Sequence, residues 1–291
     1  EEKGKPGNWG KSRPIFSIEF RDVSKLVLKG EFKQPSLPGK LAAQSLKVDS
    51  RIMKQVSPEA KIKLISESEC TVLLSLLRRH FATGQVGERT QQYLTELLKS
   101  GRFAFFKMGY QKDLEDLNCS DTNEIRRIFV SFRDEPAVLK KLGEIVAVDF
   151  FIGNTDRFDK DGRIVNYGNV FLLRKDVRMP VGLDFFAESS ESVSLFGGSL
   201  ATWEGKILKD VGWVLTFSEK AINCLNEYFS AKLPQLTSKE LLGPKAVNTL
   251  AAGIAEGSEK IKAYLKRKIG ANKAVPSGVM ERMKILGWLK N

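Results

Sequence analysis

The stretch Gly153-Asn154-Thr155-Asp156-Arg157-Phe158 decides how this chain is interpreted, because it is the densest polar cluster in the sequence. Before it, residues 137–151 carry apolar side chains at helical spacing and predict a long helix that ends abruptly at the cluster. After it come two short apolar runs, residues 169–173 and 180–184, which predict two strands joined by a charged turn. We therefore expect a polar loop held between a buried helix and a small hairpin.

Three polar residues of this region follow one another in a chemically suggestive order, namely Asp156, Asn169 and Asp184. Kinases present a hydroxyl-orienting aspartate and then two metal ligands in this order. Phosphoryl transfer requires an aligned hydroxyl and hard oxygen donors for Mg²⁺, which prefers carboxylate and amide oxygens. Asp and Asn also cap turns and helix ends routinely, so a purely structural role for the same residues stays open.

The sequence resembles the phosphoinositide 3/4-kinase-like atypical kinases, and among them the type II phosphatidylinositol 4-kinases most closely. HipA-type kinases and the secretory-pathway Golgi kinases are similar in their core. The resemblance rests on residues 154–157 with Asn169 and Asp184, on residues 106–110 as a connector, and on an N-terminal loop, hairpin and lysine. It spans about residues 7–190 at the level of motifs. It implies an ATP- and Mg²⁺-dependent kinase, with Mn²⁺ as an alternative metal.

The resemblance also implies a role for individual residues. Asp156 is expected to be the catalytic aspartate, and Asn169 and Asp184 the metal ligands. Lys29 is expected to contact the ATP phosphates and Glu69 to orient it, with Glu67 as the rival partner. The expected nucleotide-binding residues also include a phosphate-covering glycine flap and an adenine-contacting connector, formed by Gly7, Gly10, Ser12, Phe106, Lys107 and Met108.

The chain departs from the family pattern near the catalytic aspartate. Phe158 stands where many relatives have His or Gly, and the insertion 159–163 lengthens the interval to Asn169. Asn166 is therefore a competing metal ligand. The acceptor preference of the family is therefore not carried over. The cysteine cluster that anchors animal type II lipid kinases is absent as well, so membrane attachment would have to come from surface charge.

Three functions therefore stay open from the sequence. The connector with Tyr110 favours a phosphoinositide substrate. The absence of lipid-anchoring cysteines favours a stand-alone protein Ser/Thr kinase of the bacterial toxin or secreted effector type. The third alternative is a pseudokinase or nucleotide-binding scaffold, prompted by Phe158 and the longer loop.

The predicted fold class is α+β, as a two-lobed protein-kinase-like fold of the atypical type. Residues 1–108 are expected to form an N-terminal lobe of sheet plus helix, and residues 109–291 a mainly helical C-terminal lobe, with ATP between them. In the first lobe we expect a hairpin of residues 15–20 and 26–28, with Lys29 ending its second strand. An irregular segment should follow to about residue 58. Helices are expected within 57–79 and 88–98, and a buried strand at 103–106 should lead into a connector. In the second lobe, further helices are predicted at 122–132, 218–229 and 258–268.

The composition limits which kinds of catalysis and which kinds of binding partner are expected. The formal net charge of +12 favours anionic partners, including an anionic membrane surface near the basic helix 258–268, although nucleic-acid-binding motifs are absent. Three dispersed cysteines and one histidine, His80, argue against a disulfide framework and against His- or Cys-based catalysis. No apolar run is long enough to span a membrane. We expect a cytoplasmic, reducing location, with peripheral membrane attachment or delivery into a host cell as alternatives.

Overall fold

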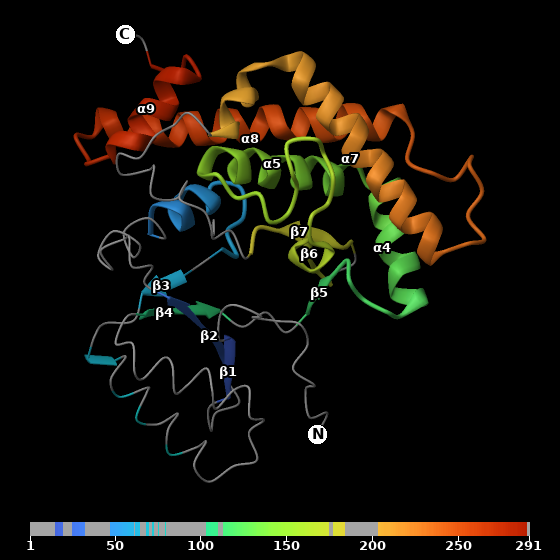
Figure 1. Cartoon of the computed structure of the whole chain (residues 1–291), viewed down its shortest axis with the longest axis horizontal. Helices are drawn as coiled ribbons and strands as arrows, with labels where there is room; N and C mark the ends of the chain where they lie inside the picture. The colour runs from blue at the N-terminus through green and yellow to red at the C-terminus, as the bar shows by residue number, and fades with distance from the viewer. Residues whose placement is uncertain are drawn as a thin grey trace. The chain divides into compact units, whose positions relative to one another are not determined.

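The computed structural model describes residues 15–19, 25–32, 47–60, 62–64, 103–109, 113–174, 177–183 and 203–289, together with residues 68, 69, 72, 75 and 79. The chain divides into two compact units. The first comprises Glu1–Lys47 and Lys61–Tyr110, and the second comprises Val48–Ala60 and Gln111–Asn291. The protein is α+β, with an antiparallel sheet in each unit, and most of the helices with described placement belong to the second unit (Figure 1).

The first unit contains a four-stranded antiparallel sheet of order β1-β2-β4-β3. Its strands are β1 (Ile15–Glu19), β2 (Lys25–Phe32), β3 (Ile62–Leu64) and β4 (Phe103–Gly109). The predicted N-terminal hairpin is confirmed, because β1 pairs with β2 from Ile15 opposite Lys29 to Glu19 opposite Lys25.

Two strand ends in this sheet differ from the prediction. Lys29 was expected to end its strand, but β2 continues to Phe32 and pairs Lys29 with Phe106 of β4. β4 was expected to stop at Phe106, but it continues to Gly109 because Met108 pairs with Val27 on one side and Ile62 on the other. Pairing with two neighbours extends a strand beyond its apolar run, which sequence spacing cannot reveal.

The expected helix start at Ser57 is wrong. Residues 54–60 form turns, and Ile62 enters the sheet, while helical backbone is found at residues 68, 69, 72, 75 and 79. A helix occupies residues 47–53 instead, in a segment expected to be irregular. The Ser57 hydroxyl accepts a hydrogen bond from the Gly182 amide (2.9 Å) and donates one to Glu59 (3.1 Å), so this serine makes tertiary contacts in place of capping a helix.

Five longer helices make up most of the described part of the second unit. They are α4 (Thr122–Asp134), α5 (Pro136–Ile152), α7 (Val211–Lys232), α8 (Pro244–Gly270) and α9 (Ser277–Ile285). The predicted helices at 122–132, 137–151, 218–229 and 258–268 are confirmed, and the last two are longer than expected. A short 3₁₀ helix, η2 (Glu204–Lys209), precedes α7.

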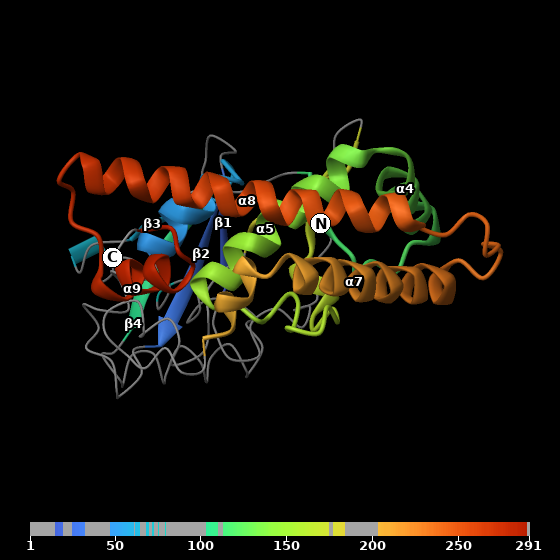
Figure 2. The same cartoon turned by 90° about the horizontal axis from the view of Figure 1, so that it is seen from above.

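Helix α5 lies at the centre of this unit and is buried along most of its length. Helix α8 runs alongside it, as both views show (Figures 1 and 2). Gly143 on α5 and Gly253 on α8 allow the close approach, because a methyl group on either would collide with backbone atoms of the facing helix. The polar loop 153–158 follows the end of α5, a helix that is buried along most of its length.

A three-stranded antiparallel sheet of order β5-β6-β7 packs beside α5. Its strands are β5 (Leu114–Asp116), β6 (Phe171–Leu173) and β7 (Met179–Val181). The two predicted strands are confirmed with shorter bounds. Asn169 was placed in the first of them but ends the 3₁₀ helix η1 (Tyr167–Asn169).

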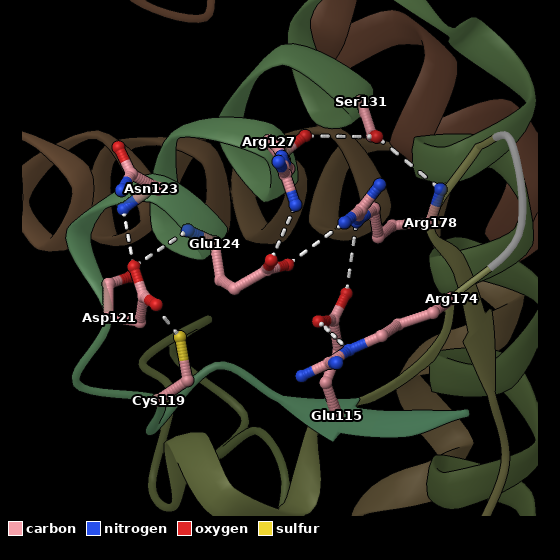
Figure 3. Close-up of polar contacts among 9 residues, drawn as sticks. All are labelled: Glu115, Cys119, Asp121, Asn123, Glu124, Arg127, Ser131, Arg174 and Arg178. Atoms are coloured by element: carbon pink, nitrogen blue, oxygen red, sulfur yellow. Dashed lines mark hydrogen bonds and ion pairs between the residues drawn. The ribbon is translucent and has the colours of Figure 1, made fainter. Parts of the chain in front are cut away.

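Charged side chains hold this small sheet against α4 (Figure 3). The Glu115 carboxylate, only 2% exposed, accepts from Arg174 (2.8 Å) and Arg178 (3.2 Å), which flank the β6–β7 turn. Arg178 also bonds to Glu124 of α4 (2.9 Å). The hairpin that connects Asn169 to Leu183 is thereby fixed at its turn.

Among the residues with described placement, no helix is sufficiently long and apolar to cross a bilayer.

Candidate active site

The polar loop begins where α5 ends in a left-handed residue. Gly153 has φ 85°, a conformation that glycine adopts without steric cost. The amides of Gly153 and Asn154 both donate to the Asp149 carbonyl (2.8 Å each), which closes the helix end. The abrupt helix end predicted from the sequence thus has a local cause.

Asp149 is a buried carboxylate within the apolar last turns of α5. It accepts a hydrogen bond from Asn154 Nδ2 (2.9 Å) and forms an ion pair with Arg157. Burial raises the pKa of the Asp149 carboxyl, and the Arg157 and Asn154 donors act in the opposite direction. The charge is accommodated because two donors from the following loop turn back to meet it.

The Arg157 guanidinium joins three separate segments of the chain. Besides Asp149, it donates from Nε to the Asn169 carbonyl (2.8 Å) and from Nη2 to the Leu183 carbonyl (2.6 Å). Asn169 and Leu183 lie at the two ends of the segment that contains the β6–β7 hairpin. The planar donors of one guanidinium are suited to hold several acceptors at defined angles. Arg157 thus brings together the loop of Asp156, the residue Asn169 and the neighbour of Asp184.

Asp156 is partly exposed, whereas Asn154 and Arg157 beside it are buried. Its backbone amide donates to Asn154 Oδ1 (3.2 Å), and its carbonyl accepts from Asn169 Nδ2 (3.4 Å). Both backbone groups of Asp156 are therefore held by side chains of the same site.

The two asparagines that were predicted as alternative metal ligands have different environments. Asn169 is buried and uses its amide nitrogen toward Asp156, which leaves its carboxamide oxygen as the group suited to a hard cation. Asn166 is exposed, and its side-chain oxygen accepts from the Gly168 amide (3.0 Å) as the cap of η1. The geometry favours Asn169.

Aromatic packing positions η1, and with it Asn169. The Tyr167 ring stacks on Tyr228 of α7 with a centroid separation of 4.5 Å. The Tyr228 hydroxyl donates to the Leu117 carbonyl, so η1, α7 and the end of β5 are linked. Burial raises the pKa of Tyr228, which keeps this hydroxyl protonated as a donor.

Phe158, which departs from the pattern of the kinases that the sequence resembles, is part of the core. It is buried and packs edge-on against Phe217 of α7, at 5.9 Å between centroids. The insertion that follows folds into a compact turn, in which Asp159 Oδ1 accepts from the amides of Asp161 and Arg163 (2.9 Å each). Both departures therefore have structural explanations, Phe158 in core packing and the insertion in a side-chain-capped turn.

The remaining predicted site residues belong to the first unit or lie outside the described residues. Lys29 and Phe106, Lys107 and Met108 are placed by their backbone in β2 and β4. Glu69 has helical backbone and is exposed. The residues outside the described set are Gly7, Gly10, Ser12, Glu67 and Asp184.

The side chains near this loop offer the oxygen atoms that a hard divalent cation prefers as ligands. Asp156 and Asn169 supply a carboxylate and a carboxamide on segments that contact each other. In the described part of the chain no cluster of three or more His, Cys, Asp or Glu side chains could hold a metal ion. Asn169 is an amide and so is not one of those four residue types, and Asp184 lies outside the described part. Neither residue therefore counts toward such a cluster.

Sequence reasoning missed the pair of Asp149 and Arg157 as the support of this site. A signal was present, since Asp149 is the only ionisable residue between Glu144 and Asp156, in an otherwise apolar run. A charge in such a run requires a buried partner. The sequence does not identify that partner, because several nearby arginines would serve.

Comparison with protein-family models, with curated proteins and with solved structures gives no significant match for this chain.

Proposed function

We propose that this chain is an ATP- and Mg²⁺-dependent kinase that transfers a phosphoryl group to a hydroxyl acceptor, with Asp156 as the catalytic aspartate. One observation carries the proposal. The buried Arg157 guanidinium bonds to the carbonyls of Asn169 and Leu183, and so holds the loop of Asp156 against Asn169 and against the residue that precedes Asp184 in the sequence. The convergence of these three segments supports a shared site over three unrelated turn caps.

The proposed roles follow from side-chain chemistry. Asp156 orients the acceptor hydroxyl and receives its proton, since it is the carboxylate of the polar loop 153–158 and is partly exposed. Asn169 and Asp184 hold the metal ion. When bound, Mg²⁺ neutralises charge on the phosphate oxygens. Lys29 and Glu69 take the phosphate-contacting and lysine-orienting roles that the family resemblance implies. The proposal extends to a two-lobed, atypical-kinase-like fold.

The first experiment measures transfer of labelled phosphate from ATP in the presence of Mg²⁺. One arm offers phosphoinositide vesicles and a second arm offers proteins from a cell lysate. Asp156→Asn should lower incorporation by roughly 10²- to 10⁴-fold, because a positioned proton acceptor contributes about that much. Label in lipid or in protein distinguishes a phosphoinositide kinase from a protein Ser/Thr kinase.

Asp161→Asn is the matched control. Asp161 lies on the exposed insertion, where its side chain is 51% exposed and meets only Lys220 at 3.4 Å among its ion-pair contacts. Incorporation by this variant should stay close to that of the native chain. If Asp156→Asn retains full activity, the site assignment is wrong. If neither acceptor is labelled although ATP binds, the chain is a nucleotide-binding scaffold and the kinase proposal fails.

A further inference from the structure

A pocket lies within the second unit, and none of its lining residues is assigned to phosphoryl transfer. Its volume is about 370 Å³, within the usual range for small-molecule sites. Four segments line it: the helix 47–53, the C-terminal half of α8, the loop that follows α8, and the first turn of α9. No step of the proposed kinase reaction uses this pocket.

The inner surface of the pocket is apolar. Ile52, Leu265 and Val279 line it and are 0%, 3% and 0% exposed. They come from three of the four segments, so the floor is a continuation of the core. A ligand that reaches this floor gains stability by removing its own apolar surface from water.

The rim of the pocket is cationic. Arg51, Lys268 and Lys273 line it from the helix 47–53, from α8 and from the following loop. Within the described chain, none of the three forms an ion pair with an acidic side chain. Other lysines of α8 do: Lys260 pairs with Glu144 (2.5 Å), and Lys262 pairs with Glu259 (2.9 Å).

Tyr264 links the cations to the apolar floor. It lines the pocket, and Lys268 Nζ lies 5.4 Å from its ring centroid. Burial raises the pKa of Tyr264, while the positive charges of Arg51 and Arg267 act to lower it. Arg51 and Arg267 therefore lie within electrostatic reach of the same ring, although they belong to different helices.

The negative end of the α8 dipole explains the position of only some of the cations near the pocket. Arg267 and Lys268 stand in the last turn of α8, where cations are generally favourable. Arg51 and Lys273 belong to other segments and are not explained in this way. In addition, Pro276 and Val279 place the first turn of α9 at the pocket, and that helix has no side-chain N-cap. Its dipole adds to a positive potential at the pocket.

We propose that this pocket binds an organic phosphate, that is, a phosphate group joined to an apolar group, either as a free small molecule or as the exposed part of a lipid. Arginine and lysine side chains at the rim would bind the phosphate oxygens, and the buried aliphatic side chains would receive the apolar group. This inference does not depend on the proposed kinase activity, because it uses none of the residues assigned to that activity.

Binding of phenyl phosphate to the full chain, followed by calorimetry and by chemical-shift changes of backbone amides, tests the proposal. Phenyl phosphate should bind more tightly than inorganic phosphate, and the shifts should centre on residues 48–52 and 264–279. The combined variant Arg51→Gln, Lys268→Gln and Lys273→Gln should weaken binding by roughly tenfold or more, as expected for lost charge-assisted hydrogen bonds. A parallel arm measures association with phosphatidylcholine vesicles with and without phosphatidic acid.

A control variant with the same loss of charge is Lys209→Gln, Lys232→Gln and Lys239→Gln. These lysines are exposed, and none of them lines this pocket. Their replacement should leave phenyl phosphate binding nearly unchanged. Ala274→Trp, which fills the pocket from its exposed edge without altering charge, should also weaken binding.

The possible results of these experiments distinguish a soluble ligand from a lipid and show when the proposal fails. Binding of free phenyl phosphate supports a soluble ligand, and binding only of vesicles that contain phosphatidic acid supports a lipid, provided that the pocket variants reduce it. Equal losses in the pocket and control variants would reduce the effect to net charge and overturn the proposal. Absence of binding in both arms would overturn it as well. A kinase-inactive Asp156→Asn chain should bind as the native chain does, so failure of one proposal is distinguishable from failure of the other.

Discussion

Arg157 and Asp149 form an ion pair whose side chains are only 1% and 5% exposed. The pair connects the last turns of α5 to the loop that bears Asp156, and the same guanidinium reaches the carbonyls of Asn169 and Leu183. It is therefore both a local link and the point at which three distant segments meet.

Removing one charge of this pair should destabilise the fold strongly. Asp149→Asn leaves the Arg157 guanidinium buried without its counter-charge, and the free energy of unfolding should fall by about 3 to 5 kcal/mol. Urea denaturation followed by circular dichroism measures the change. Arg127→Gln is the control, because Arg127 is 61% exposed in its pair with Glu124 and should contribute less than about 1 kcal/mol. Similar losses in the two variants would contradict the assigned role of the buried pair.

Asn169 should matter more for metal dependence than Asn166. Asn169→Ala removes the proposed ligand oxygen, so the Mg²⁺ concentration for half-maximal phosphate transfer should rise by roughly tenfold or more. Asn166→Ala removes a cap of η1 and should change that concentration little. The measurement is a Mg²⁺ titration of activity at saturating ATP. A larger shift for Asn166→Ala would exchange the two assignments.

The close contact between α5 and α8 should not tolerate a methyl group. Gly253→Ala directs its new atom at the backbone of Lys140, and overpacking of this kind costs about 1 to 3 kcal/mol. Gly270→Ala, at the end of the same helix, meets nothing within 4 Å and should be neutral or slightly stabilising. Thermal unfolding of both variants provides the test, and equal melting temperatures would show that the helices can separate at no cost.

The hydrogen bonds from Arg178 to Glu115 and Glu124 should make the free energy of unfolding depend on pH in the acid range. The hydrogen bond from Arg178 lowers the pKa of Glu124, so the stability from this contact is present above the ordinary carboxyl pKa of 4.5 and is lost as pH falls through the lower folded-state pKa. Arg178→Met should cost about 1 to 3 kcal/mol at neutral pH, since Glu115 also loses a partner.

The difference between the native chain and Arg178→Met should therefore shrink in acid below about pH 4.5. Denaturation midpoints across that range measure it. Lys284→Met, which removes an exposed contact with Glu281 at 3.8 Å, is the control and should show little difference at any pH. A constant difference for Arg178→Met would mean that its contribution comes from packing alone.

Elements that depend on interactions between near neighbours in the sequence could be predicted, whereas those that depend on contacts between distant residues could not. The helices α4 and α5 were predicted almost to their ends, because their apolar periodicity and the Gly153 stop are local. The helix start at Ser57 was wrong, because that hydroxyl bonds to Gly182, far along the chain. Lys29 and Met108 lie within strands that pairing has lengthened, and no local pattern encodes that pairing.

The sequence by itself determined the α+β class, the central helix with its polar loop, and the order Asp156, Asn169, Asp184, because these depend on residue type and short-range spacing. Only the tertiary structure decided that Arg157 pairs with Asp149 and that Asn169 faces Asp156 while Asn166 caps η1. It also decided that three cations from separate segments, which form no ion pair within the described residues, line one pocket with an apolar floor. The physical reason is that a buried charge selects its partner by proximity in the folded chain, and sequence alone does not specify which of several similar side chains will be there.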